Sequence, residues 1–150
     1  MNIKYVHTNI IAQDWQRLAK FYEEVFGCKP VPPQRDQSGD WLERGTGVTG
    51  AHLRGMHLRL PGWGENGPTL EIFQYDAMQE KPSPPLANRQ GFGHIAFLVD
   101  DVASIREEIL ARGGRDIGQI SETDVTGVGH LTFIYMTDPE ENILEIQNWS

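Results

Sequence analysis

Two stretches of the chain share one order of apolar and polar residues. Residues 3–12 (IKYVHTNIIA) and 91–100 (GFGHIAFLVD) are typical of β-strands, and each precedes a segment with apolar residues at helical spacing. These segments, 14–26 and 101–113, carry apolar residues at i, i+3 and i+7, which predicts helices with one buried face. The apolar positions are Trp15, Leu18 and Tyr22 in the first segment and Val102, Ile105 and Ile109 in the second.

The two stretches are related by a constant offset of 87 residues. That offset relates His7 to His94, and it also relates the ends of the two helical segments. Asp14 and Asp101 stand where a helix needs an N-cap acceptor, and Gly27 and the Gly113–Gly114 pair stand where a left-handed residue ends a helix. The repeat therefore predicts two copies of one α/β module.

Each module continues as three further strands. We expect strands near 28–32, 52–60 and 69–75 in the first module and near 116–121, 129–136 and 142–148 in the second. Turns are predicted at 62–67 and 137–141.

A single domain over residues 1–150 is expected, with module 1 at 1–79, a proline-rich hinge at 80–90 and module 2 at 91–150. The first module has extra residues between its helix and its last strand. We assign them to 33–50, a polar, glycine-rich segment that is predicted to be a mobile loop.

Both modules end on the tripeptide Leu-Glu-Ile, at 70–72 and 144–146. Because side chains alternate along a strand, Glu71 and Glu145 face away from the apolar residues beside them. His7 and His94 likewise face away from the helices. An uncompensated carboxylate inside an apolar strand is unfavourable, so four such residues at repeat-related positions suggest compensation by a cation. The alternative is a solvated second sheet face with ordinary surface residues.

Imidazole and carboxylate donors suit Zn²⁺, Ni²⁺, Co²⁺, Fe²⁺ or Mn²⁺, and this ligand set does not choose among them. We therefore expect one divalent metal ion as cofactor, with His7, Glu71, His94 and Glu145 as ligands.

The composition narrows the function classes. The net charge of −8 argues against a nucleic-acid partner, which would favour a basic stripe. No apolar run approaches the ~20 residues of a membrane span, and the N-terminal residues contain no signal-peptide core. The single cysteine, Cys28, excludes an internal disulfide and fits a reducing compartment. We expect a cytoplasmic protein that acts on a small molecule, with no membrane partner and a structural Cys28.

The segments GHIAFLVDDV (93–102) and DPEENILEI (138–146) resemble the vicinal oxygen chelate superfamily, which includes glyoxalase I, methylmalonyl-CoA epimerase and extradiol dioxygenases. The resemblance covers nearly the whole chain. It implies an α+β fold of two tandem βαβββ modules that form a curved mixed sheet around a central metal site.

Among superfamily members, the glyoxalase I-like ligand set reads His7, Glu71, His94 and Glu145 in this chain. The resemblance thus implies a metal-dependent lyase or isomerase that stabilises an enediolate-type intermediate of a substrate with vicinal oxygens. Glu145 and Glu71 are the candidate catalytic bases, and Glu145 is favoured because the last-strand glutamate is the more constant in these families.

Two alternatives stay open. Tyr135, upstream of Asp138-Pro139 and Glu145, resembles part of the extradiol dioxygenase signature, with His130 further upstream. This favours an Fe(II) catechol-type dioxygenase. The other alternative is a non-catalytic small-molecule binding or resistance protein.

The candidate substrate contacts are His57, Tyr135 and Trp41, and Trp41 and Trp63 are expected on loops that cap the pocket. A homodimer is expected, because relatives of this length are commonly dimers. The ligands come from one chain or from two; the sequence leaves both arrangements open.

Overall fold

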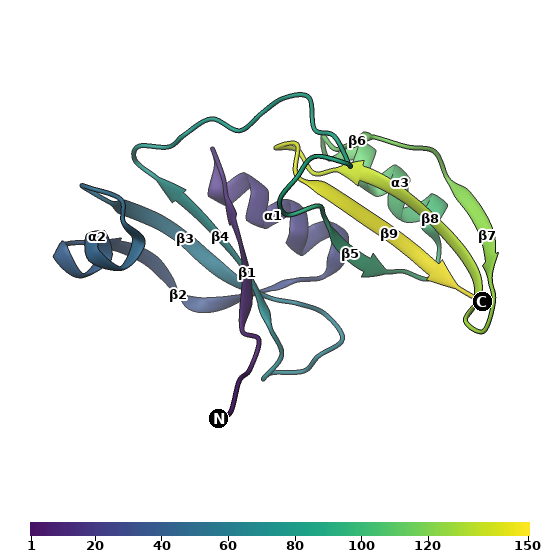
Figure 1. Cartoon of the computed structure of the whole chain (residues 1–150), viewed down its shortest axis with the longest axis horizontal. Helices are drawn as coiled ribbons and strands as arrows, with labels where there is room; N and C mark the ends of the chain where they lie inside the picture. Colours follow the sequence, from purple (N-terminus) through teal and green to yellow (C-terminus); the bar gives the residue numbers. More distant parts are fainter. The chain divides into compact units, whose positions relative to one another are not determined.

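A computed structural model describes all residues 1–150 and divides the chain into two units, Met1–Glu80 and Lys81–Ser150. Each unit holds one mixed sheet with a long helix against it (Figure 1). The α+β class is therefore confirmed, as is the repetition of one βαβββ plan. The assignment of 80–90 as a hinge stays a prediction.

The first unit forms a four-stranded sheet in the order β1-β4-β3-β2. β1 and β4 are parallel, and the other neighbours are antiparallel. The elements are β1 His7–Ile11, α1 Trp15–Phe26, β2 Lys29–Ser38, α2 Asp40–Thr46, β3 His52–Arg59 and β4 Thr69–Tyr75.

The second unit repeats this topology as β5-β9-β8-β6, with β7 paired to β8. β5 is parallel to β9, as β1 is to β4, and the other pairs are antiparallel. The elements are β5 Ile95–Leu98, α3 Val102–Ala111, β6 Arg115–Asp116, β7 Ser121–Val125, β8 Gly129–Thr137 and β9 Ile143–Trp149.

Local signals in the sequence set the ends of both long helices. The Asp14 carboxylate accepts a hydrogen bond from the Arg17 amide at 3.1 Å, and Asp101 accepts one from the Ser104 amide at 3.0 Å. Each bond satisfies a backbone donor that the first helical turn leaves free. Gly27 ends α1 in the left-handed conformation, with φ of 69°. The predicted N-caps and the Gly27 cap are confirmed. After α3 the left-handed residue of the predicted pair is Gly113, with φ of 92°, and not Gly114.

The core of each unit lies between its helix and one face of its sheet. The predicted helix stripe is buried at its centre, since Leu18, Tyr22 and Ile109 are inaccessible to solvent. The strands contribute Leu58, Leu70 and Ile72 in the first unit and Ile134, Met136, Leu144 and Ile146 in the second. Apolar burial of this kind is the main stabilising contribution to each unit.

The prediction of a mobile loop over 33–50 is wrong. β2 continues to Ser38, with a register shift between Val31 and Arg35, and α2 follows it. Leu42 of α2 is buried in a cluster with Ala51, Leu53 and Phe73. The segment is ordered because Leu42 packs α2 against the sheet. A single apolar residue gives no periodic pattern in the sequence, so the sequence does not predict this helix.

The predicted strand at 116–121 is also wrong. β6 ends at Asp116 because the chain bends there: the amides of Ile117 and Gly118 both donate to the Tyr135 carbonyl. Pairing with β8 resumes only in β7. The first strand of each module is shorter than expected, so His94 lies directly before β5 rather than within it.

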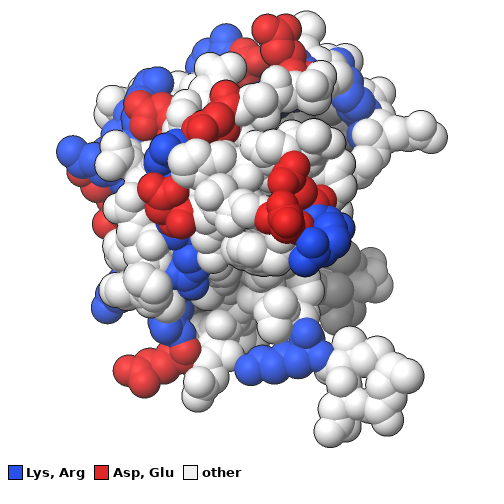
Figure 2. All heavy atoms as spheres, turned by 90° about the vertical axis from the view of Figure 1, so that its left-hand side faces the viewer, with Lys and Arg blue, Asp and Glu red and all other residues white.

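Charged side chains of both signs are interspersed on the surface. Figure 2 shows acidic and basic groups close together on one face, with wide uncharged areas between them and no continuous basic stripe on that face. None of the helices has the length and apolar character needed to cross a bilayer.

Gly55 in β3 tests how closely the first sheet is packed. A Cβ at this position would overlap the Ile72 carbonyl oxygen and lie 2.9 Å from the Phe73 Cα. We expect Gly55→Ala to lower the free energy of unfolding by about 1–3 kcal/mol, as overpacking does. Thermal unfolding should show a melting temperature lower by about 2–4 °C per kcal/mol for a chain of this size.

Gly45 in α2 provides the matched control. Nothing lies within 4 Å of a Cβ at this position, and alanine favours helix by about 1 kcal/mol over glycine. Gly45→Ala should therefore leave the melting temperature unchanged or raise it. An unchanged melting temperature for Gly55→Ala would contradict the close approach of β3 to β4.

Cys28 is buried at the end of α1, and burial raises the pKa of its thiol to about 12. Because the thiolate is the nucleophile, we expect no reaction of the native protein with a disulfide reagent near pH 8. One thiol should react promptly after unfolding in guanidinium chloride. Rapid labelling of the native chain would show that Cys28 is accessible and would overturn its structural role.

Candidate functional site

The alternation of β4 and β9 determines where the two glutamates lie. Leu70 and Ile72 pack beneath α1, so Glu71 projects from the opposite face of its sheet. Glu145 occupies the same position in β9, between the buried Leu144 and Ile146. The outward direction predicted for both glutamates follows from this packing.

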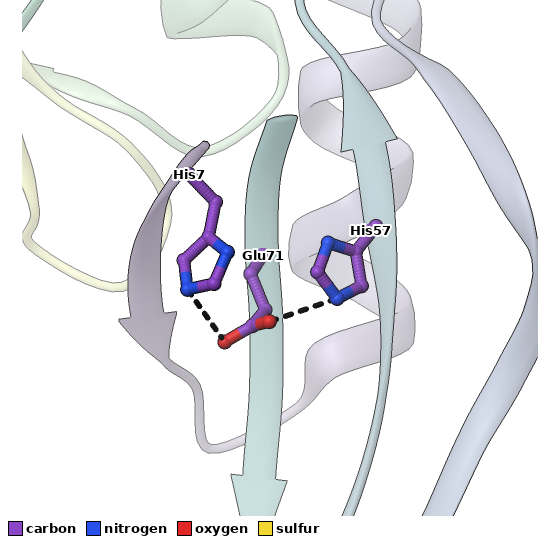
Figure 3. Close-up of side chains that lie close together, drawn as sticks. All are labelled: His7, His57 and Glu71. Atoms are coloured by element: carbon purple, nitrogen blue, oxygen red, sulfur yellow. Dashed lines mark ion pairs between the residues drawn. The ribbon is translucent and has the colours of Figure 1, made fainter. Parts of the chain in front are cut away.

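In the first unit, His7 and Glu71 lie close together. His7 Nε2 is 3.8 Å from Glu71 Oε1 (Figure 3). The parallel register of β1 and β4 pairs Asn9 with Glu71, and the Asn9 side-chain amide donates to Glu71 Oε1 at 2.8 Å. Two residues of β1 thus approach the same carboxylate oxygen.

His57 of β3 completes this group from the other side. It is the cross-strand partner of Glu71, and its Nε2 lies 2.8 Å from Glu71 Oε2 (Figure 3). Its Nδ1 lies 3.0 Å from the Thr69 hydroxyl. Burial lowers the pKa of His57, a shift that the charge of Glu71 opposes. The imidazole is therefore neutral near pH 7, the form that ligates metals.

The donor set of the first unit suits a divalent transition metal. One ring nitrogen each from His7 and His57 and one oxygen of Glu71 lie within 4.8 Å of one another. The Glu71 side chain is only 12% exposed, so its charge is partly shielded from water. Two imidazoles and a carboxylate are ligands that Zn²⁺, Ni²⁺, Co²⁺, Fe²⁺ and Mn²⁺ accept.

In the second unit, His94 and Glu145 form the corresponding pair, with 2.9 Å between Nε2 and Oε2. The turn before β9 orients the glutamate. The buried Asp138 carboxylate accepts hydrogen bonds from the Glu140 and Asn142 amides at 2.8 and 3.0 Å, and Glu141 adopts a φ of 66°. Hydrogen bonds within residues 138–142 thus hold the turn that leads into the strand carrying Glu145.

Tyr135 of β8 lies beside this pair. Its ring centroid is 4.6 Å from that of His94, and it is the cross-strand partner of Glu145. Burial and the neighbouring Glu145 charge raise the pKa of the Tyr135 phenol. Tyr135 is therefore a neutral hydroxyl, able to donate a hydrogen bond or a proton.

Other residues singled out in the sequence lie apart from these groups within their own units. His130 faces away from Tyr135, since the two are five residues apart on β8, and its Nδ1 is 2.7 Å from Asp124 Oδ1. This Asp124 hydrogen bond raises the pKa of His130.

The placement of Trp41 on a loop is wrong. Trp41 belongs to α2, because the docking of Leu42 orders that segment, and its indole donates to the Ser38 carbonyl at 3.0 Å. The cluster residues Leu53 and Phe73 share the sheet face of His57 and Glu71. The α2 helix therefore covers one end of that face, and Trp41 is exposed on it.

Two curated relatives resemble the chain along most of its length. It is 29% identical over 147 residues to a 2-epi-5-epi-valiolone epimerase from an Actinomyces species, covering 95% of this chain and 77% of that protein. It is 27% identical to a probable lactoylglutathione lyase from Vibrio parahaemolyticus, covering 98% of this chain and 92% of that one.

Solved structures share the fold. A glyoxalase family protein from Bacillus cereus matches with a TM-score of 0.74 at 14% identity, over 99% of this chain and 94% of that one. A glyoxalase/bleomycin resistance protein/dioxygenase from Alicyclobacillus acidocaldarius matches with a TM-score of 0.54 at 17% identity, over 97% and 91%. A family model matches residues 4–146, and the chain belongs to the Glyoxalase/Bleomycin resistance protein/Dioxygenase superfamily.

Proposed function

We propose that this chain is a metal-dependent lyase or isomerase of the glyoxalase type. It would act on a small substrate with two vicinal oxygens and move a proton at the carbon beside a carbonyl group. Relatives named as a lactoylglutathione lyase and a valiolone epimerase support this reaction class. The observation that carries the proposal is the recurrence of one histidine–glutamate pair in each unit, on the sheet face away from the helix.

The two pairs supply the metal ligands in this proposal: His7 and Glu71 from the first unit, His94 and Glu145 from the second. A divalent cation held by them would supply Lewis-acid stabilisation of negative charge on two adjacent substrate oxygens. The chain's own residues then have to hold the carboxylates in place and to move the proton.

The surroundings of the two glutamates favour Glu145 as the base. Glu71 is held at both oxygens, by Asn9 at Oε1 and by His57 at Oε2. In the second unit, the place of Asn9 is taken by Ala96, which pairs with Glu145 but has no side-chain donor. Glu145 is held through one oxygen by His94, so it has more freedom to approach a substrate carbon.

The proton transfer runs through the Glu145 carboxylate. The substrate C–H bond breaks, an O–H bond forms on Glu145, and the electron pair moves into an enediolate. In an isomerisation Glu145 then returns the proton to the neighbouring carbon, and in an epimerisation a proton returns to the same carbon from the opposite face. Neither outcome consumes an oxidant or reductant. Tyr135, a neutral hydroxyl beside the His94–Glu145 pair, is placed to donate a hydrogen bond to the negatively charged substrate oxygen.

The test is turnover by protein stripped of metal and reloaded separately with Zn²⁺, Ni²⁺, Co²⁺, Fe²⁺ and Mn²⁺. Two substrates are supplied in D₂O: the hemithioacetal of methylglyoxal and glutathione, and 2-epi-5-epi-valiolone. We expect isomerisation or epimerisation of one substrate, with exchange of its carbon-bound proton detected by NMR. Glu145→Gln should lower kcat by about 10²–10⁴-fold, the usual contribution of a positioned base.

His130→Gln is the control, because His130 lies on the opposite face of β8 from Tyr135 and should leave kcat unchanged. Stoichiometric metal without conversion of either substrate would remove the lyase or isomerase assignment. Wild-type protein that takes up none of the five metals would favour a non-catalytic binding protein.

A second candidate is an Fe(II) extradiol dioxygenase, favoured by the position of Tyr135 beside His94 and Glu145. After anaerobic loading with iron, this activity predicts oxygen consumption with catechols, and Tyr135→Phe should reduce it. Failure with several catechols by iron-loaded protein would retire this candidate. The orientation of His130 already weighs against it, since His130 does not share the face of Tyr135.

A further inference from the structure

His57 occupies a position that the ligand pattern expected from the sequence leaves out. Its Nε2 points at Glu71 from β3, while His7 approaches from β1 on the other side of β4 (Figure 3). The two imidazole rings are 5.6 Å apart between centroids and nearly perpendicular. Three donors from three adjacent strands therefore converge within the first unit alone.

The donor distances are close to those of a coordinated ion. Ligands bound at about 2.0–2.2 Å in a tetrahedral site are roughly 3.4 Å apart. The first unit has 2.8 Å between His57 Nε2 and Glu71 Oε2, and 3.8 Å between His7 Nε2 and Glu71 Oε1. All three donor atoms, including the ring nitrogens of the two histidines, lie within 4.8 Å of one another.

The neighbours of these donors have the chemistry of an outer coordination shell. A ligating histidine uses its second ring nitrogen to hydrogen-bond a fixed partner, and the Thr69 hydroxyl is that partner for His57 Nδ1 at 3.0 Å. A hydroxyl both donates and accepts, so the His57 proton can reside on Nδ1 and leave Nε2 free for a metal. The Asn9 side-chain amide orients the Glu71 carboxylate by donating a hydrogen bond to its Oε1.

The second unit has no equivalent third donor. Tyr135 pairs with Glu145 across β8 and β9 as His57 pairs with Glu71 across β3 and β4. Its phenol is a poorer metal donor than an imidazole, because its one donor oxygen carries a proton. The two units therefore differ. The first carries three metal donors on the sheet face away from its long helix, and the second carries two.

We propose that His57 is a metal ligand and that His7, His57 and Glu71 form a three-donor site which anchors a divalent transition metal ion in the first unit. The inference rests on the proposed metal dependence and deepens it. Retention of the ion then depends on His57 as strongly as on His7 and Glu71. Glu145, a ligand in the proposed function, can then leave the ion for proton transfer, since the three donors of the first unit keep the ion bound.

The experiment measures metal binding by the full chain, without reference to activity. Chelator-stripped protein is titrated with Zn²⁺ by calorimetry and with Co²⁺ by visible absorption, which reports the ligand field. We expect His57→Gln to raise the Kd by at least 10–100-fold, the range seen even for outer-shell partners, and to change the Co²⁺ spectrum.

His52→Gln is the matched control. His52 lies on the same strand but faces the other way, between Asp36 and Asp76, with nitrogen–oxygen distances of 2.6 and 2.8 Å. This variant should bind both metals as the wild type does. Circular dichroism and melting temperature establish that each variant is folded.

A second measurement uses the wild type and so does not depend on the folding of a variant. In ¹⁵N-histidine-labelled protein, Zn²⁺ should shift the Nε2 resonance of His57 to the position of a metal-bound nitrogen, together with that of His7. An unchanged His57 resonance at saturating Zn²⁺, or wild-type affinity in His57→Gln, would overturn the proposal while leaving the proposed function intact. Failure of wild-type protein to bind any divalent metal would overturn both.

Discussion

The whole arrangement depends on one constraint: each sheet is covered by a long helix on one face, and its strands alternate. Leu70 and Ile72 must pack against α1, so Glu71 has to project from the other face, and β9 imposes the same outcome on Glu145. A carboxylate held there beside apolar neighbours requires a compensating partner. A histidine is this partner in each unit. The polar groups on the sheet face away from the helix are therefore a consequence of the apolar packing on the face beneath the helix.

The two units meet this requirement differently. In the first, Glu71 lies between a histidine on each side and is oriented by Asn9, so its position is determined by the two neighbouring strands, β1 and β3. In the second, Ala96 and Tyr135 occupy the positions of Asn9 and His57, and Glu145 depends on His94 alone within its unit. Both units thus keep one histidine–glutamate pair. The residues around the pair differ, so the Glu71 carboxylate is more restrained than that of Glu145.

Features set by neighbouring residues could be predicted from the sequence. Asp14 and Asp101 cap their helices through contacts three residues away, and the strand alternation of Leu-Glu-Ile determines the direction of each glutamate. The correspondence of His7 with His94 and of Glu71 with Glu145 followed from the internal repeat. These features need only local geometry and the comparison of one module with the other.

Features set by distant contacts could not be predicted. The parity of β3 places His57 opposite His52, but only the register with β4 brings it to Glu71 rather than to Thr69 or Phe73, and that register depends on the loop between the strands. The order of α2 likewise depends on the docking of a single residue, Leu42, into a cluster formed by β3 and β4. A lone apolar residue in a polar segment carries no periodic signal.

These contacts also explain how one fold accommodates both a fixed and a movable carboxylate. A metal ligand benefits from a carboxylate whose orientation is established before binding, because less side-chain entropy is lost. A general base has to follow the proton between two carbons and is hindered by the same restraint. Glu71, hydrogen-bonded by Asn9 at Oε1 and approached by His57 at Oε2, suits the first role, and Glu145, approached by a histidine at one oxygen, suits the second. Glu71 has Asn9 and His57 as its cross-strand neighbours, whereas Glu145 has Ala96 and Tyr135. This difference is sufficient to give the two glutamates different roles on otherwise equivalent strands.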